Sequence, residues 1–137
     1  MTPQTRFSAQ EISHAIISAA LRVHSDLGPG LLERAYQACL RQELLTAGLR
    51  CDIQVPLPVV YKGVKLDIGY RIDLLVQDLV IVEIKSVEAI SPVHQVQVIS
   101  YRKLSGKSLG LLMNFNVVHL KDGIRRFVSG TQWRISA

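Results

Sequence analysis

The segment Leu79-Val80-Ile81-Val82-Glu83-Ile84-Lys85 places two opposite charges at the end of an apolar run that is typical of a buried strand. Because side chains of a strand alternate between its two faces, Glu83 and Lys85 share one face. An uncompensated buried charge is costly, so both residues must be paired with each other, paired with another group or bound to a metal. The preceding segment, residues 71–76, has the same anomaly, because Asp73 interrupts its apolar residues.

The distance between Asp73 and Glu83 depends on the turn that joins their strands at Gln77-Asp78. A two-residue loop would set Asp73 opposite Val82, whereas one extra loop residue or a bulge would set it opposite Glu83. In the second register, two carboxylates about 5 Å apart face one pocket. Such a pair is repulsive alone and suits a hard divalent cation, so this register predicts a magnesium or manganese site.

The first part of the chain predicts two helices. Ser8 and Glu11 form a capping box for a first helix, which ends at Gly28-Pro29-Gly30. Apolar residues at helical spacing predict a second helix over residues 31–47, and Gly48 is placed as its C-terminal stop. The two helices should form a hairpin.

The composition then changes to β-branched runs separated by turn residues. These runs predict an antiparallel meander of three strands, at residues 50–61, 64–76 and 79–86. Pro56 and Pro58 cannot donate hydrogen bonds to a sheet, so the first strand lies at an edge or is interrupted there.

A strand, helix, strand unit follows the meander. Ser91 and Gly106 are placed to begin and end a helix over residues 93–105. A strand over residues 109–114 would then lie parallel to residues 79–86 through a right-handed crossover. Two short strands, at residues 117–120 and 124–128, would close the chain as a hairpin. The 137 residues thus predict one α/β domain, with a mixed central sheet packed against helices.

Composition adds weaker constraints. The net charge of +5 favours an anionic partner such as nucleic acid, although many proteins without one are equally basic. Cys39 and Cys51 have no accompanying zinc motif and are interpreted as buried free thiols. No apolar run is long enough to cross a bilayer and residues 1–10 lack a signal-peptide core, so we expect a cytoplasmic protein with no membrane contact.

The order of these motifs resembles a known superfamily. Asp73, then Glu83-Ile84-Lys85 and a crossover helix, is similar to the core of the PD-(D/E)xK nucleases, although Ile72 stands where that name has a proline. The segment Gly30-Leu31-Leu32-Glu33-Arg34-Ala35-Tyr36 resembles the GxxExxY signature of a family of small bacterial proteins in that superfamily. Gln97 to Tyr101 follows as QxxxY, and the resemblance spans roughly residues 12–128.

The resemblance implies a restriction-endonuclease-like αβββαβ core with extra C-terminal strands. The implied activity is metal-dependent hydrolysis of nucleic-acid phosphodiester bonds, with DNA favoured over RNA. Asp73 and Glu83, helped by the backbone carbonyl of Ile84, would hold Mg²⁺ or Mn²⁺. Lys85 would position the attacking water or steady charge on the scissile phosphate. For these residues, a structural ion-pair network is the alternative, with Lys85 in a salt bridge to Glu83 or Asp73.

Three further residues join the predicted site chiefly through the resemblance. Glu33 would be an additional acidic group near the metal, although a carboxylate in the first turn of a helix is also favoured by the helix dipole. Gln97 and Tyr101 would orient the catalytic residues or the substrate backbone, and a satisfied polar helix face is the alternative. A rival function is a nuclease-like module that binds nucleic acid or protein with weak or absent turnover. A homodimer is a possible assembly.

Overall fold

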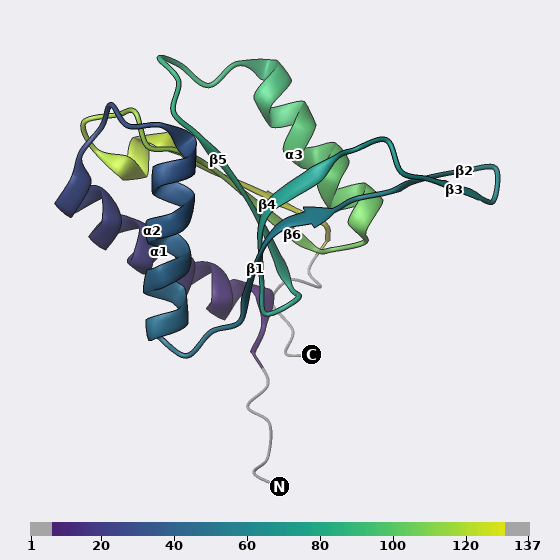
Figure 1. Cartoon of the computed structure of the whole chain (residues 1–137), viewed down its shortest axis with the longest axis horizontal. Coiled ribbons are helices and arrows are strands. Elements are labelled where there is room, and N and C mark those ends of the chain that lie inside the picture. The colour runs from purple at the N-terminus through teal and green to yellow at the C-terminus, as the bar shows by residue number, and fades with distance from the viewer. Residues whose placement is uncertain (1–6, 131–137) are drawn as a thin grey trace, which may run out of the picture.

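The computed structural model describes residues 7–130 and centres on a five-stranded mixed sheet (Figure 1). Its strands, in spatial order, are β1 (Cys51–Pro56), β4 (Arg71–Val76), β5 (Val80–Lys85), β6 (Leu109–Asn114) and β7 (Ile124–Val128). Only β5 and β6 pair in parallel, and the other neighbours are antiparallel. The predicted α/β architecture with a mixed sheet, and the parallel crossover within it, are confirmed.

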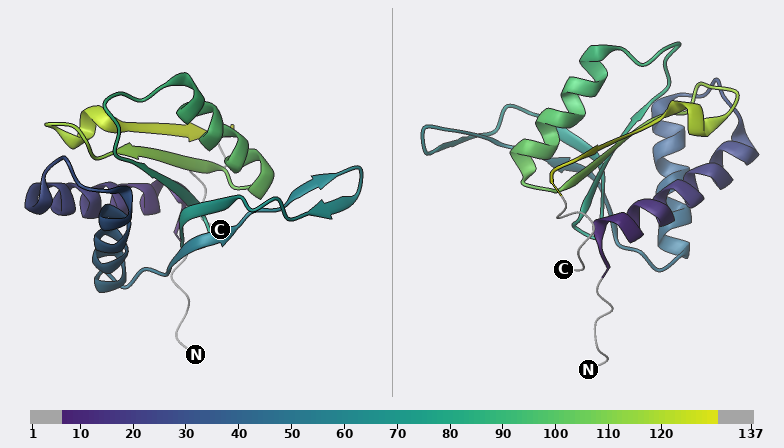
Figure 2. Two further views of the ribbon diagram at one scale, coloured as in Figure 1. Left: turned by 45° about the horizontal axis from the view of Figure 1, so that its top comes forward. Right: turned by 180° about the vertical axis from the view of Figure 1, so that it is seen from behind.

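Three helices cover the sheet, with α1 (Ala9–Leu27) and α2 (Glu33–Thr46) on one face and α3 (Pro92–Ser105) on the other (Figure 2). The capping box of Ser8 and Glu11 is present, and Ser91 with His94 forms a second one at the start of α3. The larger core fills the space under α1 and α2. It includes Ile12, Ile16, Leu40, Leu44, Leu74, Val76, Val80, Val82, Leu109 and Leu111.

The meander is less regular than the sequence predicted, because two of its strands are broken. Residues 50–61 divide into β1 and β2 (Val59–Tyr61), and residues 64–76 divide into β3 (Val64–Leu66) and β4. The break in the first strand falls at Pro56 and Pro58, which cannot donate to a ladder. β2 and β3 pair only with each other and project from the body as an arm (Figures 1 and 2).

The predicted C-terminal hairpin is wrong. Residues 120–123 form a 3₁₀ turn, η1 (Leu120–Gly123), and β7 pairs with β6 instead. The carbonyl of Val117 is taken by the His24 ring, whose Nε2 lies 2.8 Å away, so this segment is held by α1 rather than by a strand. Gly123 packs on the end of β6, where a Cβ would lie too close to the carbonyl oxygen of Asn114.

Both cysteines are free thiols, as the sequence predicted, but Cys39 is only partly buried. Cys51 is buried, and burial raises the pKa of its thiol to about 11. Across residues 7–130, no helix combines the length and apolarity needed to span a bilayer. The expectation about a signal peptide concerns residues 1–10, of which the first six lie outside the described range.

Candidate active site

The register between β4 and β5 brings Asp73 and Glu83 together. Val76 pairs with Val80 and Leu74 pairs with Val82, so one further residue along sets Asp73 against Glu83. This is the second of the two predicted registers, in which an extra residue follows the turn at Gln77-Asp78. Gln77 and Asp78 both have positive φ, 53° and 55°, which closes the turn tightly before the ladder begins.

Two hydrogen bonds hold the carboxylates of Asp73 and Glu83 at the point where this ladder ends. The backbone N–H of Asp73 donates to Glu83 Oε1 over 3.2 Å, and the backbone N–H of Ile84 donates to Asp73 Oδ2 over 2.9 Å. Each carboxylate thus accepts an N–H from the opposite strand, in place of a carbonyl oxygen. The two carboxyl groups therefore lie next to each other where the β4–β5 ladder ends.

Glu83 is almost fully buried, with 3% of its surface exposed. Burial raises the pKa of its carboxyl group to about 9, and the charge of Asp73 and a hydrogen bond to its side chain add to the rise. Lys85 opposes the shift only weakly, as the smallest of the causes. The carboxyl group of Glu83 therefore holds its proton more tightly than an exposed glutamate does.

Gln54 is a residue of this site that the sequence did not indicate. Its Nε2 lies 3.3 Å from Asp73 Oδ1 and donates to Gln37 Oε1 over 2.8 Å, which connects β4 through β1 to α2. Gln54 has a φ of 49°, and the β1–β4 ladder is interrupted there. If the pairing of β2 with β3 continued into β1 and β4, Asp73 would lie opposite Asp52. The irregular residues 67–70 shift this pairing by two residues, so Asp73 lies opposite Gln54 instead.

Lys85 lies at the end of β5 with its side chain half-buried. Its backbone carbonyl accepts a hydrogen bond from the N–H of Phe115 over 2.9 Å, which fixes the end of the strand. Its ammonium group makes no hydrogen bond or ion pair within residues 7–130. The alternative of a direct salt bridge to Glu83 or Asp73 is therefore not what the structure contains, and the ammonium group can contact a ligand.

Tyr36 of the GxxExxY segment holds the loop between α1 and α2. Its hydroxyl donates to the carbonyl of Gly28 over 2.6 Å and accepts from the N–H of Leu31 over 3.1 Å. The ring is fully buried and stacks on Phe115, with centroids 4.5 Å apart. Gly30 has a φ of 99°, a conformation that side-chain-bearing residues rarely adopt. The glycine and the tyrosine of the segment thus have structural reasons to be there.

That loop is tied to the residue that follows Lys85. Ser86 Oγ donates to the carbonyl of Leu31 over 2.5 Å, and the N–H of Ser86 lies 3.4 Å from Glu33 Oε1. Glu33 is exposed in the first turn of α2 and lines the same cleft as Asp73. The structure thus brings Glu33 to the mouth of the predicted site but does not join it to the two carboxylates.

Gln97 and Tyr101 approach from the other face of the sheet. Gln97 Nε2 lies 3.4 Å from the hydroxyl of Tyr101, whose ring is buried beside Tyr70. Burial raises the pKa of Tyr101, Gln97 opposes the rise, and the charges of Glu83 and Asp73 add to it. The QxxxY pair therefore lies within electrostatic reach of the carboxylates, and its two residues also satisfy each other.

A cleft of about 1130 Å³ between α2 and β1 opens onto Asp73. Its lining includes Glu33, Arg34, Gln37, Arg41, Gln54 and Asp73. Within residues 7–130, no group of three or more acidic, histidine or cysteine side chains is arranged to hold a metal ion.

Comparison with known proteins agrees with this geometry. A family model described as the PD-(D/E)XK nuclease superfamily matches residues 10–127. The chain therefore belongs to the PD-(D/E)XK nuclease superfamily, and its mixed sheet flanked by helices is consistent with a restriction-endonuclease-like fold. No curated protein and no solved structure matches the chain significantly.

Proposed function

We propose that this protein is a metal-dependent nuclease whose active site is built on Asp73, Glu83 and Lys85. The observation that carries the proposal is the pairing of the two carboxylates where the β4–β5 ladder ends. Membership in a nuclease superfamily makes nucleic acid the expected substrate. Within that superfamily, the resemblance of residues 30–36 to the GxxExxY signature supports our proposal that the chain belongs to a family of small bacterial proteins.

The donor set fits a hard divalent cation. Two oxygen-rich side chains and the carbonyl of Ile84 are ligands that Mg²⁺ and Mn²⁺ prefer, and Mg²⁺ commonly takes only one or two carboxylates and keeps several waters. Burial and the charge of Asp73 raise the pKa of Glu83, and a cation bound beside it would stabilise its charged form. When bound, the ion would supply an activated water and neutralise charge on the phosphate.

The remaining roles follow from where the side chains lie. The ammonium group of Lys85, one residue beyond Ile84 and unpaired within residues 7–130, would hold the attacking water or the phosphate oxygens. Glu33 would help to order water at the mouth of the cleft. Gln97 and Tyr101 would hold the carboxylates or the substrate backbone in position from the α3 side. The attacking water gives up a proton as its oxygen bonds to phosphorus, the P–O bond to the leaving group breaks, and the leaving oxygen takes a proton.

The proposal extends to substrate, location and assembly. We expect DNA to be cut in preference to RNA, in the cytoplasm of a bacterial cell.

A homodimer is favoured by the β2–β3 arm, because Tyr61, Val64 and Leu66 expose apolar side chains on a hairpin that would be only marginally stable alone. Light scattering on the wild type and on Val64→Lys tests this: the wild type should be dimeric and the variant monomeric, and a monomeric wild type would refute it.

Cleavage assays test the activity. Circular and linear duplex DNA, single-stranded DNA and RNA are incubated with the protein in Mg²⁺, Mn²⁺ or chelator. Wild type should cut in metal only, and Asp73→Asn and Lys85→Ala should lose at least about a hundredfold in rate, as removal of one charge-stabilising group typically does. Lys121→Ala, an exposed lysine on η1, is the matched control and should keep full activity.

The rival function predicts a different pattern. A nuclease-fold module that only binds nucleic acid or protein would retain binding and cut none of the four substrates in either metal. Cleavage that survives in Lys85→Ala, or that persists in chelator, would instead point to a contaminating enzyme. Opening of circular DNA would show internal cutting, since an enzyme that needs an end cannot start on a circle.

A further inference from the structure

Two arginines on α2 line the cleft that leads to Asp73. Arg34 and Arg41 are seven residues apart, so they lie on one face of the helix, two turns from each other. Both side chains are exposed rather than packed into the core. Arg34 directly follows Glu33, which lies at the mouth of the predicted site.

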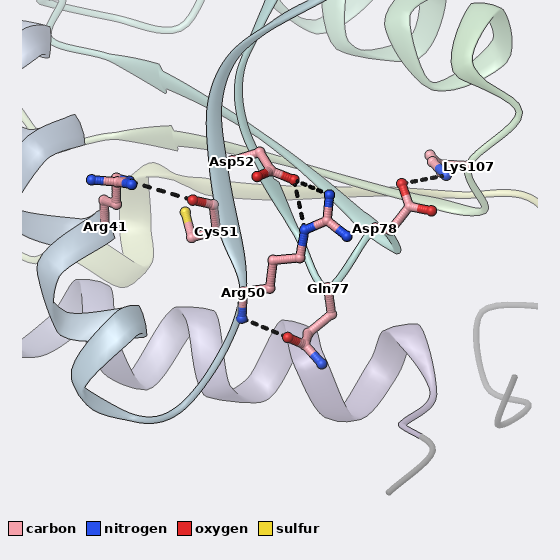
Figure 3. Close-up of polar contacts among 7 residues, drawn as sticks. All are labelled: Arg41, Arg50, Cys51, Asp52, Gln77, Asp78 and Lys107. Atoms are coloured by element: carbon pink, nitrogen blue, oxygen red, sulfur yellow. Dashed lines mark hydrogen bonds and ion pairs between the residues drawn. The ribbon is translucent and has the colours of Figure 1, made fainter. Parts of the chain in front are cut away.

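The two guanidinium groups have donors available to a ligand. Arg41 donates from Nε to the carbonyl of Cys51 over 3.3 Å, which fixes the side chain along the cleft wall (Figure 3). Its terminal N–H groups remain available to bind a ligand. The side chain of Arg34 makes no hydrogen bond or ion pair within residues 7–130. Guanidinium groups bind phosphate through paired hydrogen bonds, so these two residues have the chemistry of phosphate contacts.

Other basic residues are placed less well. Lys107 is paired with Asp78 over 3.1 Å (Figure 3), at the turn that precedes β5. Asp73 and Glu83 lie toward the opposite end of β5. A strand that ran over Lys107 would therefore meet the sheet away from the carboxylate pair, whereas the α2 cleft opens onto Asp73 directly.

We propose that the α2–β1 cleft binds the phosphodiester backbone of a nucleic-acid strand, with Arg34 and Arg41 contacting its phosphates. This rests on the proposed nuclease function and gives it a substrate path. Seven helical residues rise about 10 Å, and successive phosphates of one B-form strand rise about 3.4 Å, so the two contacts lie about three nucleotides apart. The acidic end of the cleft, at Glu33 and Asp73, then receives the phosphate to be cut.

Binding without cleavage tests the path. Anisotropy of fluorescein-labelled single- and double-stranded oligonucleotides is measured against salt concentration in chelator, for the wild type, Arg34→Ala, Arg41→Ala and the double variant. Each phosphate contact contributes about 0.7 to 0.9 to the slope of log K against log salt, so each substitution should lower the slope by that amount. Charge-reversed Arg34→Glu should weaken binding further, and circular dichroism checks folding.

The matched control is Arg125→Ala, because Arg125 is an exposed arginine on β7, at the opposite edge of the sheet from β1. It should keep the wild-type slope. If Arg125→Ala lowers binding as much as the cleft variants do, or if the double variant keeps the wild-type slope, the path is refuted.

The outcome separates this path from the nuclease function. Suppose that the wild type binds but never cuts, and that the double variant lowers the slope of log K against log salt by the amount expected for about two phosphate contacts. The path then stands and the nuclease function falls. If the wild type cuts and the double variant cuts with unchanged KM and kcat, the function stands and the path falls. A raised KM with kcat kept at saturation supports both.

Discussion

The backbone N–H of Ile84 donates to Asp73 Oδ2, so a carboxylate occupies the place of a strand carbonyl at the end of the β4–β5 ladder. The ladder pairs end at Leu74 and Val82, immediately before this point. A sheet can thus present two carboxylates side by side without leaving the N–H groups of Asp73 and Ile84 unsatisfied. The carboxylates of Asp73 and Glu83 thus both form the candidate acidic site and accept the backbone hydrogen bonds that the ladder leaves open at its end.

The raised pKa of Glu83 predicts how the stability of the metal-free protein depends on pH. Between the ordinary pKa of 4.5 and the folded value of about 9, the unfolded chain releases a proton that the folded chain keeps. The free energy of unfolding should therefore fall as pH rises through this window. Glu83→Gln removes the titration, so it should stabilise the protein at about pH 8 by at least 1 kcal/mol and change little near about pH 5.

Urea denaturation in chelator at both pH values measures this difference. Glu88→Gln is the matched control, because Glu88 is exposed in the loop after β5. The control should follow the wild type at each pH. An equal effect of Glu83→Gln at the two pH values would show that Glu83 is ionised in the folded chain.

Gln54 should position Asp73 at a cost in backbone strain. Gln54→Ala removes the hydrogen bonds to Asp73 and Gln37 but leaves a side chain at a φ of 49°, whereas Gln54→Gly also relieves the strain. The glycine variant should be more stable than the alanine variant by about 1 kcal/mol. Both should bind Mn²⁺ about tenfold more weakly than the wild type, because loss of a group that orients a metal ligand has that effect. Unchanged Mn²⁺ affinity in both would make Gln54 merely structural.

Tyr36→Phe should destabilise the fold by about 1–3 kcal/mol. The substitution removes a buried hydroxyl that bridges Gly28 and Leu31, and leaves their backbone groups without that partner. Thermal or urea unfolding measures the loss. Tyr61→Phe, on the exposed arm, is the control and should be close to neutral. Equal stability of the two variants would contradict the bridging role.

Gly110→Ala should destabilise the contact between β6 and α3. A Cβ at Gly110 would lie 2.9 Å from Cγ1 of the buried Val98, so one of the two elements must shift. We expect a loss of about 1–3 kcal/mol, as overpacking of a core produces. The double variant with Val98→Ala should be less destabilised than the sum of the single variants by more than about 0.5 kcal/mol. Additive losses would show that the two groups do not collide.

The pairing and layers of the fold could be predicted because local signals agreed with it. The capping residues Ser8 and Ser91 and the αL glycine Gly106 determine helix ends by local hydrogen bonding, and these ends lie where the sequence indicated. The sequence left open whether the first strand lies at an edge or is interrupted at Pro56 and Pro58, and the structure shows both. The 3₁₀ turn could not be predicted, because it depends on tertiary contacts. Among them is the bond from His24 to the carbonyl of Val117, between residues far apart in the sequence.

The candidate site divides in the same way. Asp73 and Glu83 are conspicuous because charge is costly in apolar strands, and their register depends on one short turn. Gln54 carries no such signal, since a glutamine in an edge strand is ordinary and its place opposite Asp73 depends on irregular residues 67–70. Nothing in the sequence marks Arg34 and Arg41 either, because they line a cleft that exists only once α2 has packed beside β1.

Direct binding of Mn²⁺ tests the central claim, that Asp73 and Glu83 form a divalent-metal site. Electron paramagnetic resonance of free Mn²⁺ is titrated with protein near about pH 8, for the wild type, Asp73→Asn and the exposed control Asp26→Asn. The account predicts that the wild type and Asp26→Asn bind Mn²⁺ alike and that Asp73→Asn binds at least about tenfold more weakly, a loss of about 1.4 kcal/mol or more. Equal affinity of Asp73→Asn and the wild type would contradict it.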